Sequence, residues 1–281
     1  MIDDRAARPS AAGAPLPLAP GDAIAPGYVV LEHMRRGHDT DTYDAWSEER
    51  TSRCVIKTLR PDRAGDRSAR NRLLREGRLL QRLTHPHIVR GYETLTQPVA
   101  AIVLETLPGQ TLAHLIETRR SPLPATDLAH LGLHLCSAVQ YLHRHGVLHL
   151  DLKPSNVIAS HGVAKLLDLS VARPPGRSRA CIGTVGYMAP EQLDGGHLDA
   201  GTDVWGIGAV LFEAVTGNAP APADAATDTG GMVQIDPAPV SLRRYRRLPT
   251  AFRTLVERCL GLDPAARPTL AELRVELESV V

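Results

Sequence analysis

Three polar residues of different chemistry stand close together in the stretch HLDLKPSN, residues 149–156. Asp151 offers a carboxylate, Lys153 an ammonium group and Asn156 an amide, at spacings suited to phosphoryl transfer. A carboxylate can take a proton from a hydroxyl, an ammonium group can neutralise phosphate charge, and an amide oxygen is a suitable ligand for Mg²⁺. The remainder of the chain has to supply the elements that would position these groups.

The composition is that of an ordinary globular protein. The 281 residues suffice for one large domain or for two lobes around a cleft, with 43% hydrophobic and 22% charged residues. The formal net charge is +1, whereas binders of nucleic acid or of membrane surfaces usually need a concentrated basic face. The densest basic run, RRYRR at 243–247, is short and is typical of a solvated surface. We therefore expect no nucleic-acid partner and no membrane partner.

The sequence has no pattern typical of export or membrane insertion. Its longest apolar stretches are far shorter than the roughly 20 residues that a membrane-spanning helix needs. The N-terminus begins with Asp3 and Asp4 instead of a basic region before an apolar segment, which argues against a signal peptide. Its four cysteines are far apart and form no CxxC pair, so neither disulfides nor zinc are expected. We expect a cytoplasmic protein.

Two kinds of hydrophobic pattern divide the chain. Residues 1 to about 26 are rich in Ala and Pro, which predicts a flexible tail. Strand patterns dominate the next part of the chain and cover residues 28–34, 42–46, 53–59 and 100–107. Helical patterns cover residues 70–83, 128–146, 202–217 and 249–262. This order predicts an α+β fold, with a small β-rich lobe followed by a larger helical lobe and a cleft between them.

From about residue 28 to residue 280 the chain resembles the catalytic domain of a bacterial, eukaryotic-like Ser/Thr protein kinase. The motifs, in chain order, are VIK at 55–57, HLDLKPSN at 149–156, DLS at 168–170, GTVGYMAPE at 183–191, DVW at 203–205 and DPAARPT at 263–269. Any one motif alone would be weak evidence, but their order and intervals together are specific. The resemblance implies a bilobal protein-kinase fold over residues 27–281, with an N-lobe of about 27–106 and a C-lobe of about 107–281.

The resemblance also implies how ATP and Mg²⁺ would be held in the cleft. Lys57 would contact the α and β phosphates, and Glu76 would pair with Lys57 to fix its position. Asn156 and Asp168 would bind Mg²⁺ through oxygen atoms. These four residues make ATP and Mg²⁺ the expected cofactors.

The reacting groups follow from the same resemblance. Asp151 would accept or orient the proton of the substrate hydroxyl, and Lys153 would neutralise the γ-phosphate. In this family a lysine at that position accompanies Ser/Thr specificity. Thr184 would hydrogen-bond to Asp151 from the segment that faces the substrate. The expected partner is therefore a protein substrate.

Further residues would recognise the adenine or hold the fold. Backbone groups of Glu105 and Leu107 would hydrogen-bond the adenine, and Val55 would cover it in place of the smaller alanine usual there. Asp203 would cap the backbone of the 149–156 loop. A final pair, Glu191 with Arg267, would be buried. It would tie the activation segment, which ends at Glu191, to the helical lobe.

One motif departs strongly from the family pattern. Where the pattern reads GxGxxGxV, residues 35–42 read RRGHDTDT, so that only Gly37 remains. Glycines let backbone N–H groups approach the phosphates closely. Asp39 and Asp41 also place carboxylates near the phosphates unless both point outward. These changes predict weaker nucleotide binding than is usual in the family.

A second departure is Leu150, which stands where many relatives carry an arginine before the catalytic aspartate. That arginine binds a phosphate on the activation segment, and leucine cannot. Between Val171 and Ile182 the only hydroxyl side chain is Ser178. We expect Leu150 to lie packed within the lobe, and we expect the enzyme to be competent without phosphorylation of its own loop or to be controlled by a regulatory protein partner.

Three functions fit these observations to different degrees. An active Ser/Thr kinase accounts for the complete set of phosphate, metal and proton-handling residues. A pseudokinase that binds ATP weakly and serves as a scaffold accounts for the altered glycine-rich loop. Small-molecule kinases share an HxDxxxxN loop but would not normally carry GTVGYMAPE with a partner arginine. The sequence favours the active kinase and leaves the substrate unidentified.

Overall fold

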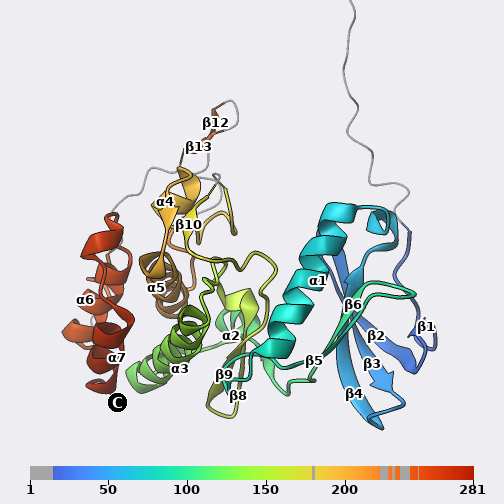
Figure 1. Ribbon diagram of the computed structural model, residues 1–281. Coiled ribbons are helices and arrows are strands. Elements are labelled where there is room, and N and C mark those ends of the chain that lie inside the picture. The colour runs from blue at the N-terminus through green and yellow to red at the C-terminus, as the bar shows by residue number, and fades with distance from the viewer. Residues whose placement is uncertain (1–14, 179–180, 222–226, 230–231, 235–240, 246) are drawn as a thin grey trace, which may run out of the picture. The chain divides into compact units, whose positions relative to one another are not determined.

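A computed structural model describes residues 15–178, 181–221, 227–229, 232–234, 241–245 and 247–281 (Figure 1). The chain divides into two compact units. The first consists of Met1–Gln81 and Gly91–Thr106, and the second of Arg82–Arg90 and Leu107–Val281. The division near residue 106 lies where the sequence pattern changes from mainly strands to mainly helices.

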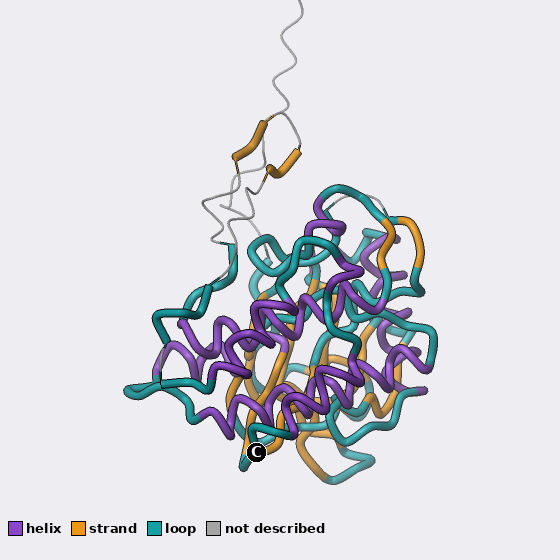
Figure 2. The backbone as a smooth tube through the Cα atoms, turned by 90° about the vertical axis from the view of Figure 1, so that its left-hand side faces the viewer, coloured by secondary structure: helices purple, strands orange, loops and turns teal. Residues whose placement is uncertain are grey.

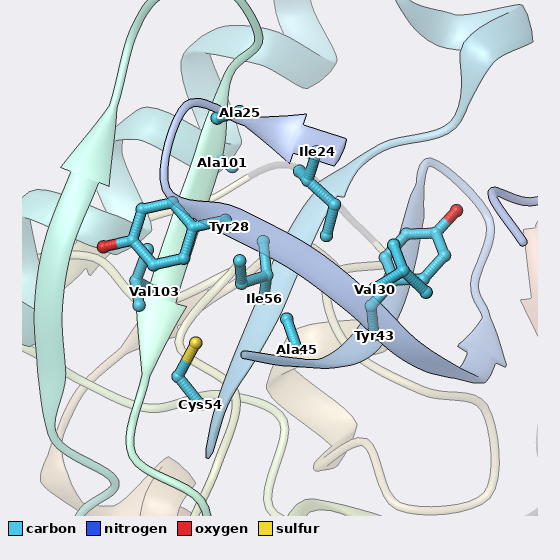
Figure 3. Packing of buried hydrophobic residues seen from close by; sticks show 10 residues of the cluster. All are labelled: Ile24, Ala25, Tyr28, Val30, Tyr43, Ala45, Cys54, Ile56, Ala101 and Val103. Carbon is cyan, nitrogen blue, oxygen red and sulfur yellow. The ribbon is translucent and has the colours of Figure 1, made fainter. Parts of the chain in front are cut away.

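The described part of the first unit contains one six-stranded antiparallel sheet with the order β1-β2-β3-β4-β6-β5. The strands are β1 (Ala23–Ala25), β2 (Tyr28–Arg36), β3 (Thr40–Ser47), β4 (Ser52–Leu59), β5 (Gly91–Leu95) and β6 (Ala101–Leu104). The sheet buries one cluster of apolar side chains, which is drawn in Figure 3 and includes Tyr43, Ala45, Cys54 and Ile56. Because side chains alternate along a strand, Val55 and Lys57 of β4 face away from this cluster.

Helix α1 (Arg67–Arg82) packs on the sheet of the first unit. Asp66 lies directly before the helix and caps it, because its carboxylate accepts hydrogen bonds from the backbone N–H groups of Ser68 and Ala69. Gly77 permits a close approach to the sheet, since a Cβ there would clash with Thr94 and would lie 3.1 Å from Cγ1 of Ile102. This contact fixes the helix that carries Glu76.

The N-terminal boundary predicted from the sequence is wrong. Residues 15–26 do not form a flexible tail, because β1 pairs with β2 and buries Ile24 and Ala25 in the core cluster. Leu18 packs against the same cluster, and its backbone N–H donates to the Tyr43 hydroxyl at 3.1 Å. A few apolar residues suffice here because β2 offers free hydrogen-bonding groups along its edge. Residues 1–14, which complete the predicted tail, lie outside the described residues.

Helices dominate the second unit (Figures 1 and 2). Its described helices of four residues or more are α2 (Leu112–Thr118), α3 (Ala125–Arg144), α4 (Pro190–Leu193), α5 (Ala200–Thr216), α6 (Thr250–Cys259) and α7 (Leu270–Glu278). Helix α5 is apolar on most of its surface and contacts α2, α3 and α6, while α7 contacts α3 and α6. A helix that is apolar on most sides is buried in this way because each side needs a partner. None of the described helices is both long enough and apolar enough to cross a membrane.

Short strands and 3₁₀ turns complete the second unit. The sheet β7-β8-β9 flanks the 149–156 loop. The described part of the second unit also contains two strand pairs, β10 with β11 and β12 with β13. The bounds are β7 (Gln110–Thr111), β8 (Val157–Ser160), β9 (Val163–Leu166), β10 (Gly176–Arg177), β11 (His197–Leu198), β12 (Thr227–Thr229) and β13 (Met232–Gln234). The 3₁₀ turns are η1 (Pro61–Arg63) in the first unit and η2 (Pro154–Asn156) and η4 (Pro264–Ala266) in the second.

Candidate active site

The carboxylate of Asp151 is the centre of a small polar cluster in the second unit. Its Oδ1 accepts a hydrogen bond of 2.6 Å from the Thr184 hydroxyl, and its Oδ2 accepts one of 2.7 Å from Nζ of Lys153. Lys153 also contacts the Thr184 hydroxyl. The Asp151 side chain is 12% exposed, so this carboxylate is largely withdrawn from water but can still be reached. The expected contact between Thr184 and Asp151 is confirmed.

Asn156 completes the cluster from η2. Its Nδ2 donates to the backbone carbonyl of Asp151 and to Oδ2 of the same residue, both at 3.0 Å. Both hydrogen bonds use the nitrogen, which leaves the amide Oδ1 available to a cation. The backbone carbonyl of Asn156 accepts from the N–H of Leu167 at 3.0 Å, so Asn156 lies beside the strand end that carries Asp168.

The oxygen atoms of Asn156 and Asp168 fit Mg²⁺. One carboxylate oxygen of Asp168 accepts from the backbone N–H of Ser170 at 2.8 Å, which orients the group. Among the described residues no group of three or more His, Cys, Asp or Glu side chains could hold a metal ion by itself. A cation at this place would therefore complete its shell with water or with phosphate oxygens, as Mg²⁺ commonly does.

Asp203 holds the backbone of the catalytic loop from helix α5. Its two carboxylate oxygens accept from the N–H groups of His149 and Leu150, both at 2.8 Å, and Nε2 of His143 lies 2.8 Å from Oδ2. Asp203 is only 1% exposed and lies in the first turn of α5, where the helix dipole stabilises a carboxylate. The predicted cap is confirmed.

His149 lies completely buried under the loop. Its Nδ1 accepts from the N–H of Asp151 at 3.2 Å, so it supports the carboxylate at the centre of the site. Burial lowers the pKa of His149, although the nearby charge of Asp203 acts in the opposite direction. The imidazole therefore remains neutral and serves as a packing and hydrogen-bonding group.

Leu150 lies in an apolar cluster in the second unit. It is 3% exposed and is buried with Leu148 and Leu198, against which Val171 and Ile182 also pack. Its backbone has φ of +67°, a conformation that is costly for a leucine. The hydrogen bond from its N–H to Asp203 and the packing of its side chain in the apolar cluster hold it there. The prediction that Leu150 packs within the lobe is confirmed.

Gln192 is a functional neighbour that sequence reasoning missed. Its Nε2 donates to the carbonyls of Leu150 at 2.8 Å and Ile182 at 2.6 Å, and so ties the catalytic loop to the segment before GTVGYMAPE. Gly183 passes close to this contact with φ of +122°, and a Cβ there would lie 2.8 Å from the Leu150 carbonyl. A buried glutamine directly after Glu191 has no signal of its own in a single sequence.

The predicted pair of Glu191 and Arg267 is present and buried. The two guanidinium nitrogens Nη1 and Nη2 donate to the carboxylate at 2.7 and 2.9 Å. Arg267 also donates to the carbonyls of Gly201 and Gly261 and lies over the ring of Trp205 at 5.0 Å. The Arg267 side chain is 0% exposed, and each of its three guanidinium nitrogens donates to an oxygen atom of the fold. These partners compensate for the burial of a charged group.

In the first unit Lys57 and Glu76 form the expected pair. Nζ of Lys57 lies 3.0 and 2.9 Å from the two carboxylate oxygens of Glu76, whose side chain is 2% exposed. Val55 lies on the same face of β4 as Lys57 and is opposite Leu104 in β6. Val55 is therefore placed beside Lys57 on the face of the sheet that does not carry the core cluster.

The two hinge residues follow β6 directly. Glu105 and Leu107 lie in the loop after Leu104, and both are partly buried. Glu105 belongs to the end of the first unit and Leu107 to the beginning of the second.

The turn that replaces the glycine-rich loop differs from the sequence expectation. Asp41 is fully buried on the core-facing side of β3, where Arg36 binds both its oxygens at 2.9 Å and His33 lies 3.2 Å away. Alternation along the sheet directs Asp41 to the face opposite Lys57. Burial alone would raise the pKa of Asp41, but the hydrogen bonds from Arg36 and His33 outweigh it and the pKa lies below its ordinary value.

Residues 28–276 match the protein kinase domain family. The chain belongs to this family. The kinase PknB of Mycobacterium leprae is 34% identical over 237 residues, and that of Mycobacterium tuberculosis is 33% identical over 241 residues. The probable serine/threonine-protein kinase SCO3848 of Streptomyces coelicolor is 31% identical over 271 residues.

The matched regions differ in how much of each protein they include. They cover 79%, 80% and 88% of this chain in the order given, and 38% of each relative. The chain thus spans well under half the length of the curated kinases it matches. The crystal structure of the PknI kinase domain from Mycobacterium tuberculosis matches with a TM-score of 0.74 and 22% identity, over 94% of this chain and 99% of that one. This likeness shows that the chain has the protein-kinase fold.

Proposed function

We propose that this chain is a Ser/Thr protein kinase that transfers the γ-phosphoryl group of ATP to a hydroxyl of a protein. The observation that carries the proposal is the Asp151 carboxylate, which already holds a hydroxyl, that of Thr184, at 2.6 Å beside Lys153. A substrate serine or threonine needs the same two neighbours: an acceptor for its proton and a cation for the incoming phosphate.

The reaction assigns a task to each group of the cluster. The substrate oxygen forms a bond to the γ-phosphorus while the bond from that phosphorus to the β–γ bridging oxygen breaks, and ADP leaves. Asp151 orients the hydroxyl and receives its proton. Lys153 lies within reach of the same carboxylate and would balance the charge on the transferred group.

The same proposal assigns the ATP and metal contacts. Lys57, held by Glu76, would bind the α and β phosphates, and Asn156 and Asp168 would bind Mg²⁺. Bound Mg²⁺ would neutralise negative charge on the phosphates. The remaining expected nucleotide contacts come from Gly37, Val55, Glu105 and Leu107.

The proposal extends to setting and partners. Use of ATP suits a cytoplasmic domain that acts on protein substrates, with a regulatory protein as a further partner. The alternative of a pseudokinase draws its support from residues 35–42, where arginine and threonine replace two glycines. Against it, the carboxylate of Asp41 is bound by Arg36 on the face opposite Lys57, and each residue needed for transfer is present.

An ATP-turnover assay on the purified protein tests the proposal. We expect Mg²⁺-dependent phosphorylation of protein that Lys57→Ala and Asp168→Ala each reduce by about 10²-fold or more. Lys57→Ala removes the cation that would bind the α and β phosphates, and Asp168→Ala removes a ligand of the Mg²⁺ that would neutralise phosphate charge. Asp168→Ala should keep the wild-type melting curve within a few degrees. Lys57→Ala should remain folded but melt lower, because it takes the Lys57 ammonium away from the buried Glu76 carboxylate. Turnover retained in either folded variant would overturn the assignment.

A further inference from the structure

The tip that joins β2 to β3 is a short turn at residues 37–39. A hydrogen bond of 2.7 Å from the N–H of Gly37 to the carbonyl of Thr40 closes this turn. In place of three glycines it has one, so the usual freedom of the backbone is reduced. Its charged side chains therefore decide where the tip lies.

Asp39 binds the tip to helix α1. Its Oδ2 accepts a hydrogen bond of 2.6 Å from Nη2 of Arg72, and its Oδ1 lies 2.8 Å from Nδ1 of His38 and 3.9 Å from Nε of Arg63. Burial alone would raise the pKa of Asp39, but the hydrogen bonds from Arg72 and His38 outweigh it and the pKa lies below its ordinary value. At neutral pH this is a charged ion pair, 21% exposed at the carboxylate.

The backbone of the same tip is held from the segment after β4. The N–H of Arg60 donates to the carbonyl of Asp39 at 3.0 Å. The Arg60 guanidinium donates through Nη1 to the carbonyls of Gly37 and His38 at 3.3 and 3.2 Å, and it is itself bound by Asp62 at 2.9 and 2.7 Å. The tip is thus bound by a side chain of α1 and by both the backbone and the side chain of Arg60 after β4.

Arg72 connects this tip to the lysine of the proposed site. Arg72 and Glu76 are four residues apart on α1, which places them one turn apart on one side of the helix. Glu76 in turn holds Lys57 at 2.9 Å. A continuous series of contacts therefore runs from Asp39 through Arg72 and α1 to Glu76 and Lys57.

We propose that Asp39 and Arg72 are positioning residues for ATP, and that their ion pair fixes the turn that stands where the family pattern has its glycines. The inference rests on the proposed function. The pair holds the turn at the position from which its backbone would meet the phosphates, and it keeps the Asp39 carboxylate neutralised and turned towards α1. An unpaired carboxylate at this tip would repel the phosphates, so losing Arg72 should harm ATP binding more than losing both partners.

Titration calorimetry with ATP and Mg²⁺ tests this order. We expect Arg72→Ala to weaken ATP binding by about 10-fold. Asp39→Asn and the double variant, which combines Asp39→Asn with Arg72→Ala, should each weaken ATP binding by about 3-fold, within the range measured for coupled neighbours. In turnover the same factors should appear in KM for ATP, with kcat at saturating ATP changed less than about twofold. A role in stability alone would not produce this split or this order.

The matched control is Arg258→Ala. Arg258 donates to Glu276 at 2.7 Å and is 43% exposed, close to the 2.6 Å contact and 42% exposure of Arg72, but it lies in α6 of the second unit. It should leave ATP binding unchanged. Tighter binding by Asp39→Asn than by the wild type, or equal binding by Arg72→Ala and the wild type, would overturn the inference.

Hydrogen exchange without nucleotide separates this inference from the proposed function. Amides of residues 37–40 should exchange about 10-fold faster in Arg72→Ala than in the wild type, and at the wild-type rate in Arg258→Ala. Unchanged exchange in Arg72→Ala would show that the Asp39–Arg72 ion pair does not hold the turn, whether or not the protein is an active kinase. If the wild type binds no ATP but Arg72→Ala still exchanges faster than the wild type, the proposed function would be overturned while the contact between Asp39 and Arg72 would stand.

Discussion

Leu150 occupies the position before the catalytic aspartate where many relatives carry an arginine. In relatives with arginine at this position, the cation binds a phosphorylated activation segment, whereas here a leucine is buried with Leu148 and Leu198. The nearby Ser178 hydroxyl accepts a hydrogen bond from Nη1 of Arg173 at 3.2 Å. A buried apolar side chain cannot pair with phosphate, so phosphorylation of Ser178 has no arginine at position 150 to recruit.

The activity should therefore not depend on phosphorylation of this segment. We expect Ser178→Ala and phosphatase-treated wild type to keep activity within about twofold of the untreated enzyme, as for substitutions that remove no needed contact. The measurement is initial velocity of phosphate transfer for the three samples, with mass spectrometry to confirm the phosphorylation state. A loss of about 10-fold in either sample would show that loop phosphorylation controls the enzyme despite Leu150.

Among the elements, the long and strongly patterned ones could be predicted from sequence. The strand predicted at 53–59 and the helix predicted at 70–83 differ from β4 and α1 by three residues or fewer at each end. The strands β7, β10 and β11 have two residues each, and their existence depends on partners distant in the chain rather than on their own pattern. The same reason explains the error at β1, whose three residues become a strand only beside β2.

Truncation of the N-terminal segment tests that correction. Deleting residues 1–25 removes Ile24, which is 5% exposed, together with Leu18 and the pairing of β1. Burial of one such side chain is worth about 1.5–3 kcal/mol, so we expect the melting temperature of the truncated protein to fall by several degrees. Deletion of residues 1–14 alone is the matched comparison and should leave it within about 1 °C. Equal melting temperatures for both truncations would contradict the role of β1.

The hairpin of β2 and β3 should make stability depend on pH through Asp41. Because the pKa of Asp41 lies below its ordinary value of about 3.9, its contribution is complete above that value and is lost as pH falls through the lower folded-state pKa. At pH 7 we expect Asp41→Asn to lose about 1.5–3 kcal/mol of unfolding free energy, the range for hydrogen bonds to charged groups.

Urea unfolding of the wild type and Asp41→Asn checks this dependence. The difference between them should shrink progressively as the pH is lowered below about 4, since the wild-type carboxylate then becomes neutral as well. Glu278→Gln is the control, because Glu278 forms an exposed pair with Arg274 that should contribute less than about 1 kcal/mol. A difference that stays constant from pH 7 to pH 3 would contradict the account.

At the scale of the molecule, the sequence identifies which residues are needed but not how they are supported. The contacts of Asp151 with Thr184, of Lys57 with Glu76 and of Asp203 with the catalytic loop were all expected. Gln192 and the arginines that hold the 37–39 turn were not, because a buried amide or an arginine has no periodic pattern and its partner lies elsewhere in the chain. Such supporting contacts become visible only when the fold brings distant segments together.

The pair of Glu191 and Arg267 joins segments that are 76 residues apart and should carry a large share of the stability of the second unit. Arg267→Ala would leave the Glu191 carboxylate, which is 9% exposed, and the carbonyls of Gly201 and Gly261 without their donor. Removing one partner of a buried pair costs about 3–5 kcal/mol, so thermal unfolding should shift down by about 5 °C or more. Arg258→Ala breaks a half-exposed pair and should shift it by only about 1 °C. Equal shifts in the two variants would mean that the buried pair contributes no more than a surface pair, contrary to its burial and to the five oxygens that accept hydrogen bonds from Arg267.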